Sequence, residues 1–153
     1  MRRRTAALGA GLAAAAAITT GGVVLFGRGH ASRPTQAAYL AHVSAVCKGF
    51  AAELNRIPPP DLGSPASVAA GAGRALPVLR RQAAAVRAID RPATLERRLD
   101  AQFRLTDRSL RDLGVALAAA RRGDRSAMGR ALAEWIAASE DARTASVKLG
   151  IRC

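Results

Sequence analysis

The sequence is poor in aromatic residues, histidine and cysteine. Of its 153 residues only 3% are aromatic, two are histidines and two are cysteines. Half of the residues are hydrophobic, so the core has to be built from alanine, leucine and valine. Such small side chains suit closely packed helices better than a β-sandwich, which favours aromatic and β-branched residues. A chain of this length has room for one domain, and we expect that domain to be all-α.

Histidine is too scarce for a classical catalytic or metal site. Beyond residue 31 the only histidine is His42, and no motif frames it as a catalytic base. His42 and Tyr39 have the i, i+3 spacing of two haem ligands, but a single histidine beside an apolar stripe is more often packed or exposed. Glu140 and Asp141 are adjacent and therefore point apart on a helix. We predict no catalytic residue, metal site or cofactor. The protein is expected not to be an enzyme, with a hydrolase of unrecognised site as one alternative.

Lysine is also rare, whereas arginine is abundant, and the formal net charge is +13. Residues 32–153 hold 20 basic and 11 acidic residues, which leaves them with a net charge of +9. A basic surface of this kind attracts anionic lipid or wall polymer. We expect it on the second helical stretch, formed by Arg74, Arg80, Arg81, Arg87 and Arg91. A merely solvated face is the simpler alternative. Nucleic acid is not expected, because no aromatic residues are interleaved with the charges.

The first 31 residues look like an export segment. Three arginines at positions 2–4 precede a run from Thr5 to Gly27 that has no charged residue. A basic flank followed by an apolar run is typical of an export signal, and this run is long enough to span a bilayer. We favour a single-pass membrane anchor over a signal peptide cleaved near Ala31. Both alternatives place residues 32–153 outside the cytoplasm, with the membrane as a partner of segment 1–31.

Apolar residues recur at steps of three and four over four stretches of the remaining chain, a spacing typical of amphipathic helices. After a spacer at 32–36, the pattern predicts helices at about 36–57, 65–90, 93–122 and 125–149. Short connections between such helices favour antiparallel neighbours. We therefore predict that residues 37–153 form an antiparallel up-down four-helix bundle, preceded by the apolar export or anchor helix.

Proline and glycine mark the expected helix ends. Three prolines at 58–60 stop the first helix, since proline lacks the amide that a helix interior needs. Ser64 predicts the N-cap of the second helix, within which Gly71, Gly73 and Pro77 predict a kink or a late start. Gly150 predicts the end of the fourth, with Ile151 folding back onto its last turn.

The third stretch alternates charge on its outer face. We expect three ion pairs within this helix, each contributing about 0.2–0.5 kcal/mol. They are Asp100 with Arg104, Asp107 with Arg111, and Arg108 with Asp112.

The two cysteines, Cys47 and Cys153, lie far apart in the sequence. In an up-down bundle the first and fourth helices are neighbours, and the tail after Gly150 is long enough to return to the first helix. Two cysteines in an exported chain are more often bonded than free. We predict a Cys47–Cys153 disulfide, which closes a loop of roughly 100 residues and contributes about 4–5 kcal/mol in the chain-entropy model. Two inert buried thiols are the alternative.

The order of these features resembles a loose group of proteins. A basic N-terminus, an apolar export segment, a cysteine closing YLAHVSAVC, a proline break and a final LGIRC are similar to the small, mostly uncharacterised exported helical proteins of high-GC Gram-positive bacteria. The resemblance covers nearly the whole chain. It implies envelope localisation and a disulfide, and it brings no catalytic residue with it.

These features predict a non-enzymatic protein of the cell envelope: an extracytoplasmic, disulfide-closed helical bundle that acts as an interaction or structural module. The first alternative is a carrier that binds a small apolar molecule between its helices. An apolar pocket of several hundred Å³ would favour the carrier. The sequence leaves the specific partner and the oligomeric state open.

Overall fold

The structure is a computed structural model that describes residues 33–152. The predicted export segment, residues 1–31, and the terminal Cys153 lie outside the described residues. Within 33–152 the regular structure is entirely helical, and no strand is present. The expected all-α class is therefore confirmed for this part of the chain. No helix within 33–152 is long and apolar enough to cross a membrane.

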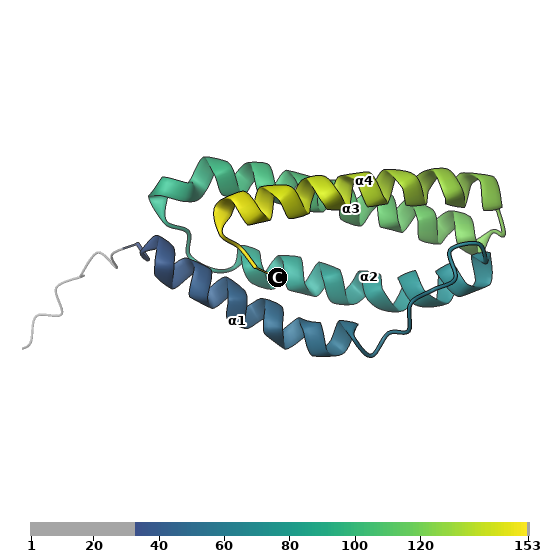
Figure 1. Ribbon diagram of the computed structural model, residues 1–153, viewed down its shortest axis with the longest axis horizontal. Helices are drawn as coiled ribbons and strands as arrows, with labels where there is room; N and C mark the ends of the chain where they lie inside the picture. The colour runs from purple at the N-terminus through teal and green to yellow at the C-terminus, as the bar shows by residue number, and fades with distance from the viewer. Residues whose placement is uncertain (1–32, 153) are drawn as a thin grey trace, which may run out of the picture. The chain divides into compact units, whose positions relative to one another are not determined.

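The four α-helices run in alternating directions along the chain (Figure 1), an arrangement compatible with the predicted bundle. They are α1 (Gln36–Leu54), α2 (Pro65–Arg87), α3 (Glu96–Arg121) and α4 (Arg125–Leu149), with the short 3-10 helix η1 (Ala93–Leu95) leading into α3. α3 packs most extensively against α4, α2 packs against α3, and α1 packs against α2. Few close backbone approaches join α1 or α2 to α4. The first and fourth helices are therefore less closely packed than we expected.

Two helices end earlier than their periodicity predicts, and prolines explain both ends. α1 and α2 each stop three residues before the expected boundaries at 57 and 90. A proline ring clashes with the carbonyl group four residues earlier. The Pro58 ring would clash with the Leu54 carbonyl in a continued helix, and the Pro92 ring would clash with the Ala88 carbonyl. Neither helix can continue far beyond those residues.

α2 runs through Pro77 from its first residue, Pro65. The late start that the glycines and Pro77 suggested is therefore wrong. Pro77 is exposed, so water can hydrogen-bond the backbone carbonyl that this proline leaves without a donor. Gly71 has a packing role instead, because a Cβ atom there would lie 3.0 Å from the Pro60 side chain.

The predicted caps of α2 and α4 are confirmed. The Ser64 hydroxyl accepts a hydrogen bond from the Ser67 amide at 3.3 Å. Gly150 ends α4 with a φ of 81°, and the Ile151 amide donates to the Ser146 carbonyl at 2.9 Å. This left-handed turn returns the chain toward the helix group, where Ile151 is buried.

Two hydrophobic clusters hold the helices together, one toward each end of the helix group. The first joins the beginnings of α2 and α4 to the end of α3, through Val68, Ala72, Leu76, Leu113, Ala116, Leu117, Ala119, Ala120, Met128, Ala131 and Leu132. The second joins α1 to the beginning of α3 and the end of the chain, through Tyr39, Val43, Cys47, Leu95, Leu99, Leu149 and Ile151. The middle parts of α2, α3 and α4 lie between the two clusters.

Candidate ligand-binding groove

A groove with a volume of about 590 Å³ lies between the two clusters. Because α3 packs against both α2 and α4, which share few close backbone approaches, α3 forms the floor and the other two helices form the walls. The lining is mainly apolar: Leu79, Ala83 and Val86 come from α2, Phe103 and Leu110 from α3, and Trp135, Ala142 and Val147 from α4. The lining of α4 extends over about 18 Å at 1.5 Å per residue. The groove is therefore long as well as apolar.

Small side chains leave this space unfilled. Ala83, Ser139 and Ala142 occupy the middle of the walls, where larger residues would close the gap between α2 and α4. Two aromatic rings also line the groove. Phe103 packs against the second cluster and Trp135 against the first, so one ring stands toward each end.

A polar seam runs along the groove where α3 meets α4. Gln102 Nε2 donates a hydrogen bond to Ser146 Oγ at 2.6 Å, and the hydroxyl groups of Ser109 and Ser139 lie 2.8 Å apart. All four residues line the groove. The two pairs are seven residues apart on each helix, which corresponds to about 10 Å. We refer to these four residues as the polar seam.

Two neighbouring hydroxyl groups face the side-chain nitrogen of Gln102. Ser146 Oγ donates to the backbone carbonyl of Ala142 at 2.9 Å, and Thr106 Oγ1 donates to the backbone carbonyl of Gln102 at 3.2 Å. Each hydroxyl has one hydrogen, so both accept from Gln102 Nε2, at 2.6 and 3.4 Å. The side-chain oxygen Oε1 consequently receives no hydrogen bond from these two hydroxyl groups. It is buried and has no hydrogen-bond partner within residues 33–152.

The C-terminal tail lines one end of the groove. Ile151 and Val43, both members of the second cluster, belong to the lining there, together with Arg152. The tail turns back at Gly150, and Ile151 joins the cluster that contains Val43 and Cys47 of α1. Arg143 also lines the groove and forms an ion pair with Glu140 at 2.8 Å. The groove thus has cationic groups at its edge and apolar side chains along its walls.

The residues described as lining the groove include no histidine and no carboxylate. Ser109 and Ser139 therefore have no neighbour in that lining to act as a general base. What the lining offers a ligand is apolar surface, hydroxyl groups and the side-chain amides of Gln82 and Gln102. This chemistry suits binding.

Two of the five arginines predicted to form a basic surface reach α3: Arg87 from the last residue of α2, and Arg91 from the connection that follows it. Arg87 Nη2 and Arg91 Nη1 each lie 2.6 Å from a carboxylate oxygen, of Asp107 and Asp100 respectively. Both guanidinium groups also lie over the Phe103 ring, at 5.2 and 5.7 Å from its centre. These arginines hold two helices together over an aromatic ring that lines the groove.

The other three predicted arginines differ in their partners. Arg81 forms an ion pair with Glu53 of α1. Arg74 Nε donates to the Ala70 carbonyl of its own helix at 3.2 Å, and Arg80 lines a second, smaller cavity. Neither Arg74 nor Arg80 has an ion pair within residues 33–152. Three of the five arginines, Arg81, Arg87 and Arg91, therefore form ion pairs with carboxylates of the same chain.

Of the three ion pairs expected within α3, one is present in the described chain. Arg108 Nε lies 3.7 Å from Asp112 Oδ2. The other two expected pairs do not form, because Asp100 and Asp107 bind the arginines that reach across from the neighbouring segment.

Cys47 is buried in the second cluster, which also contains Ile151. Its predicted partner, Cys153, lies outside the described residues. Because Ile151 is two positions before Cys153, the end of the described chain packs in the same cluster as Cys47. The disulfide stays a prediction that this packing supports.

Tyr39 and His42 do not form a joint site, because Tyr39 is fully buried and His42 is exposed. Burial raises the pKa of Tyr39 above its ordinary value of 10.0, and the positive charge of Arg91 opposes this rise. In the part of the chain that the structure describes, no group of three or more histidine, cysteine or acidic residues is placed to hold a metal ion.

No protein-family model matches the sequence, and comparisons with curated proteins and with solved structures find no match. The resemblance to small exported helical proteins therefore stays a prediction. A functional proposal has to rest on the groove itself.

The periodicity of apolar residues does not predict the polar seam. That periodicity assigns Thr106 to the apolar stripe of the third helix and gives no role to Gln102 and Ser109. The signal was nevertheless present in the sequence: Gln102, Thr106 and Ser109 follow the spacing i, i+4, i+7, and Ser139 and Ser146 are seven residues apart. Polar residues at helical spacing on two antiparallel helices indicate a shared polar line.

Proposed function

We propose that residues 32–153 form a non-enzymatic binding domain that holds a small apolar molecule in the groove. The observation that carries this proposal is the groove itself, whose volume of about 590 Å³ falls within the roughly 300–1,000 Å³ of small-molecule sites. Apolar walls with a few placed polar groups are typical of such sites. This was the first alternative inferred from the sequence.

The apolar walls supply the driving force for binding. Each methylene group that moves from water into the groove contributes about 0.8 kcal/mol, against the cost of immobilising the ligand. Affinity for a series of alkyl compounds should therefore rise with chain length until the groove is full. Longer chains should gain nothing further.

The sequence supports an extracytoplasmic setting for this domain. We propose that segment 1–31 exports the chain and contacts the membrane, either as a retained anchor or as a signal peptide cleaved near Ala31. A disulfide between Cys47 and Cys153 would close an antiparallel four-helix bundle. The burial of Ile151 beside Cys47 supports this closure.

Contact between the arginines and anionic envelope components is the competing proposal. It has less support, because Arg81, Arg87 and Arg91 are engaged by carboxylates of the same chain. Binding of this kind would be weakened by salt. Co-sedimentation of the protein with anionic vesicles at low and high salt tests it, and an absence of binding at low salt would remove it.

Trp135 offers a direct test of the groove, because it is the only tryptophan in the full chain and lines the site. Titration of the full-length protein with dodecanol should shift Trp135 emission to shorter wavelength and reach saturation. Ala142→Leu places a larger side chain in the groove and should abolish this shift.

Ala137→Leu is the matched control. It makes the same change on the exposed side of α4 and should leave the titration unaltered. An unchanged Trp135 spectrum at saturating dodecanol, or equal binding by both variants, would exclude the groove as the site.

A further inference from the structure

Gln102 places a buried hydrogen-bond acceptor on the polar seam of the groove. The residue is 8% exposed and lines the groove. Neither solvent nor any donor within residues 33–152 reaches its Oε1 atom. A buried carbonyl oxygen without a partner is unfavourable, and a ligand that supplies a donor removes that penalty.

We propose that the groove selects a neutral, elongated apolar molecule carrying a hydroxyl group, and that Gln102 Oε1 accepts the hydrogen bond from that hydroxyl. This inference rests on the proposed function, since it specifies the ligand chemistry of the same groove. Oε1 lies beneath the groove surface in the free protein, so binding includes a small rotation of the Gln102 side chain.

The hydrogen bonds around Gln102 decide that the ligand donates. The hydrogens of Ser146 and Thr106 are both used by backbone carbonyls, so these hydroxyls hold the amide nitrogen. The oxygen is the group left for a ligand. A ligand with only an acceptor finds no free donor at this point of the polar seam.

The charges around the groove decide that the donor is neutral. The described lining contains no carboxylate, while Arg143 and Arg152 belong to it. Glu140 is already paired with Arg143, so an ammonium group would enter without a free counter-charge and near the Arg152 cation, which is unfavourable in an apolar site. A hydroxyl group meets neither obstacle.

The position of the polar seam also orients the ligand. Ser146, the partner of Gln102, lies toward the end of the groove lined by Ile151, whereas Trp135 lines the other end. The two positions on α4 are about 16 Å apart at 1.5 Å per residue. The hydroxyl therefore sits near Gln102 and the alkyl chain extends toward Trp135.

The test compares two isomers on the full-length protein. Dodecanol donates a hydrogen bond, whereas undecyl methyl ether has the same atoms but only accepts. Binding is followed by Trp135 emission. The intact protein should bind dodecanol roughly ten times more tightly than the ether, the ratio expected for one satisfied buried acceptor.

Two substitutions locate the effect. Gln102→Met keeps the volume of the side chain but removes the acceptor, and the ratio of the two affinities should fall to about one. Gln36→Met is the matched control, because Gln36 is an exposed glutamine at the start of α1, outside the groove lining, and should leave the ratio intact.

The outcomes separate the two proposals. Equal affinity of the intact protein for both isomers overturns the hydroxyl preference and leaves the groove as a binding site. Binding of neither isomer overturns both proposals. A ratio that survives Gln102→Met overturns the role of Gln102, and if that variant does not fold, the ratio measured on the intact protein still decides whether a donor is preferred.

Discussion

The Arg87 guanidinium lies over the Phe103 ring, with its central carbon 5.2 Å from the ring centre, and its Nη2 donates to the Phe103 backbone carbonyl at 3.2 Å. The same guanidinium group binds Asp107. Since Phe103 also lines the groove, Arg87 packs over an aromatic ring of the groove floor. The arginine that was expected to face an external partner thus helps to hold the site together.

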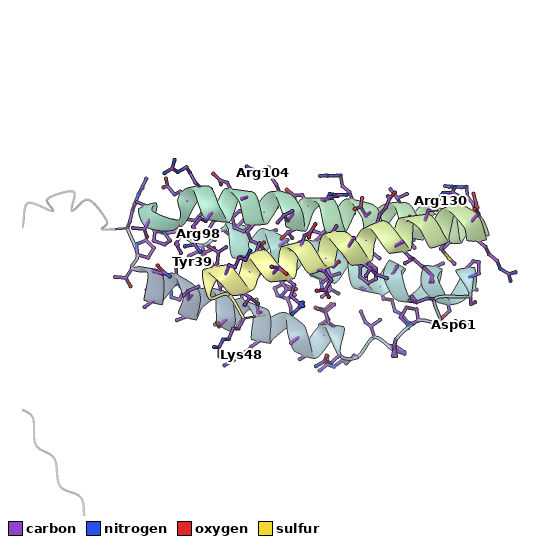
Figure 2. All side chains as sticks on the ribbon, turned by 45° about the horizontal axis from the view of Figure 1, so that its top comes forward. Tyr39, Lys48, Asp61, Arg98, Arg104 and Arg130 are labelled. Carbon is purple, nitrogen blue, oxygen red and sulfur yellow. The ribbon has the colours of Figure 1, made fainter. Side chains whose placement is uncertain are left out.

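Arg87→Ala should lower the free energy of unfolding by about 1–2 kcal/mol, because it removes a partly exposed ion pair and a cation–π contact together. Urea denaturation followed by circular dichroism measures this change. Arg104→Ala is the control, since Arg104 is exposed on the outer side of α3 (Figure 2) and has no ion pair within residues 33–152. Its effect should stay within about 0.5 kcal/mol. Equal losses for both variants would argue against the contact.

The helices themselves follow closely from the sequence, and the groove does not. Apolar spacing and the Gly150 stop predict α4 at its observed bounds, because both are local properties of the chain. The ion pairs of Asp100 and Asp107 depend on which residues of α2 and of the connection after it approach α3, and sequence spacing alone carries no such information. The groove depends on the distance between α2 and α4, which the clusters at either end determine. Apolar periodicity shows which residues face the core, but it does not show how far apart two helices stand or where a cavity remains between them.

Gly150→Ala and Gly49→Ala should change stability in opposite directions. Gly150 has a φ of 81°, and a Cβ atom there would also lie 3.3 Å from Leu40 Cδ1, so alanine should cost about 1–2 kcal/mol. Gly49 lies within α1 and a Cβ atom there would meet nothing within 4 Å, so alanine should stabilise by about 0.5–1 kcal/mol. Thermal unfolding of the two variants measures both effects. A stable Gly150→Ala protein would argue against the left-handed turn that seats Ile151.

Tyr39 predicts a loss of stability at alkaline pH. Burial raises the pKa of Tyr39 in the folded protein above 10.0, whereas in the unfolded chain the phenol titrates near its ordinary value. Its contribution is therefore complete below about pH 10 and is lost as the pH rises toward the folded-state pKa. Tyr39→Phe should be nearly neutral at pH 7, because the hydroxyl has no hydrogen-bond partner within residues 33–152.

Urea denaturation of both proteins between neutral pH and about pH 11 checks the Tyr39 prediction. The stability of the intact protein should fall more steeply than that of the phenylalanine variant above about pH 10. Parallel curves would show that Tyr39 does not titrate differently in the two states.

The proposed disulfide predicts the reactivity of the full-length protein. Iodoacetamide under denaturing conditions without reductant should label neither cysteine, and prior reduction should expose both. Cys153→Ser should lower the free energy of unfolding by about 4–5 kcal/mol, the chain-entropy value for a loop of roughly 100 residues. Complete labelling of both thiols without reductant would contradict the bond.

The central claim is that apolar molecules occupy the groove between α2 and α4, and photochemical labelling tests it most directly. A dodecanol analogue with a diazirine in its alkyl chain is bound to the full-length protein, irradiated, and located by peptide mass spectrometry. We expect adducts within segments 79–86 and 135–147, which contain the lining residues of α2 and α4, and excess dodecanol should suppress them. Adducts confined to other parts of the chain, or labelling that dodecanol does not reduce, would contradict the claim.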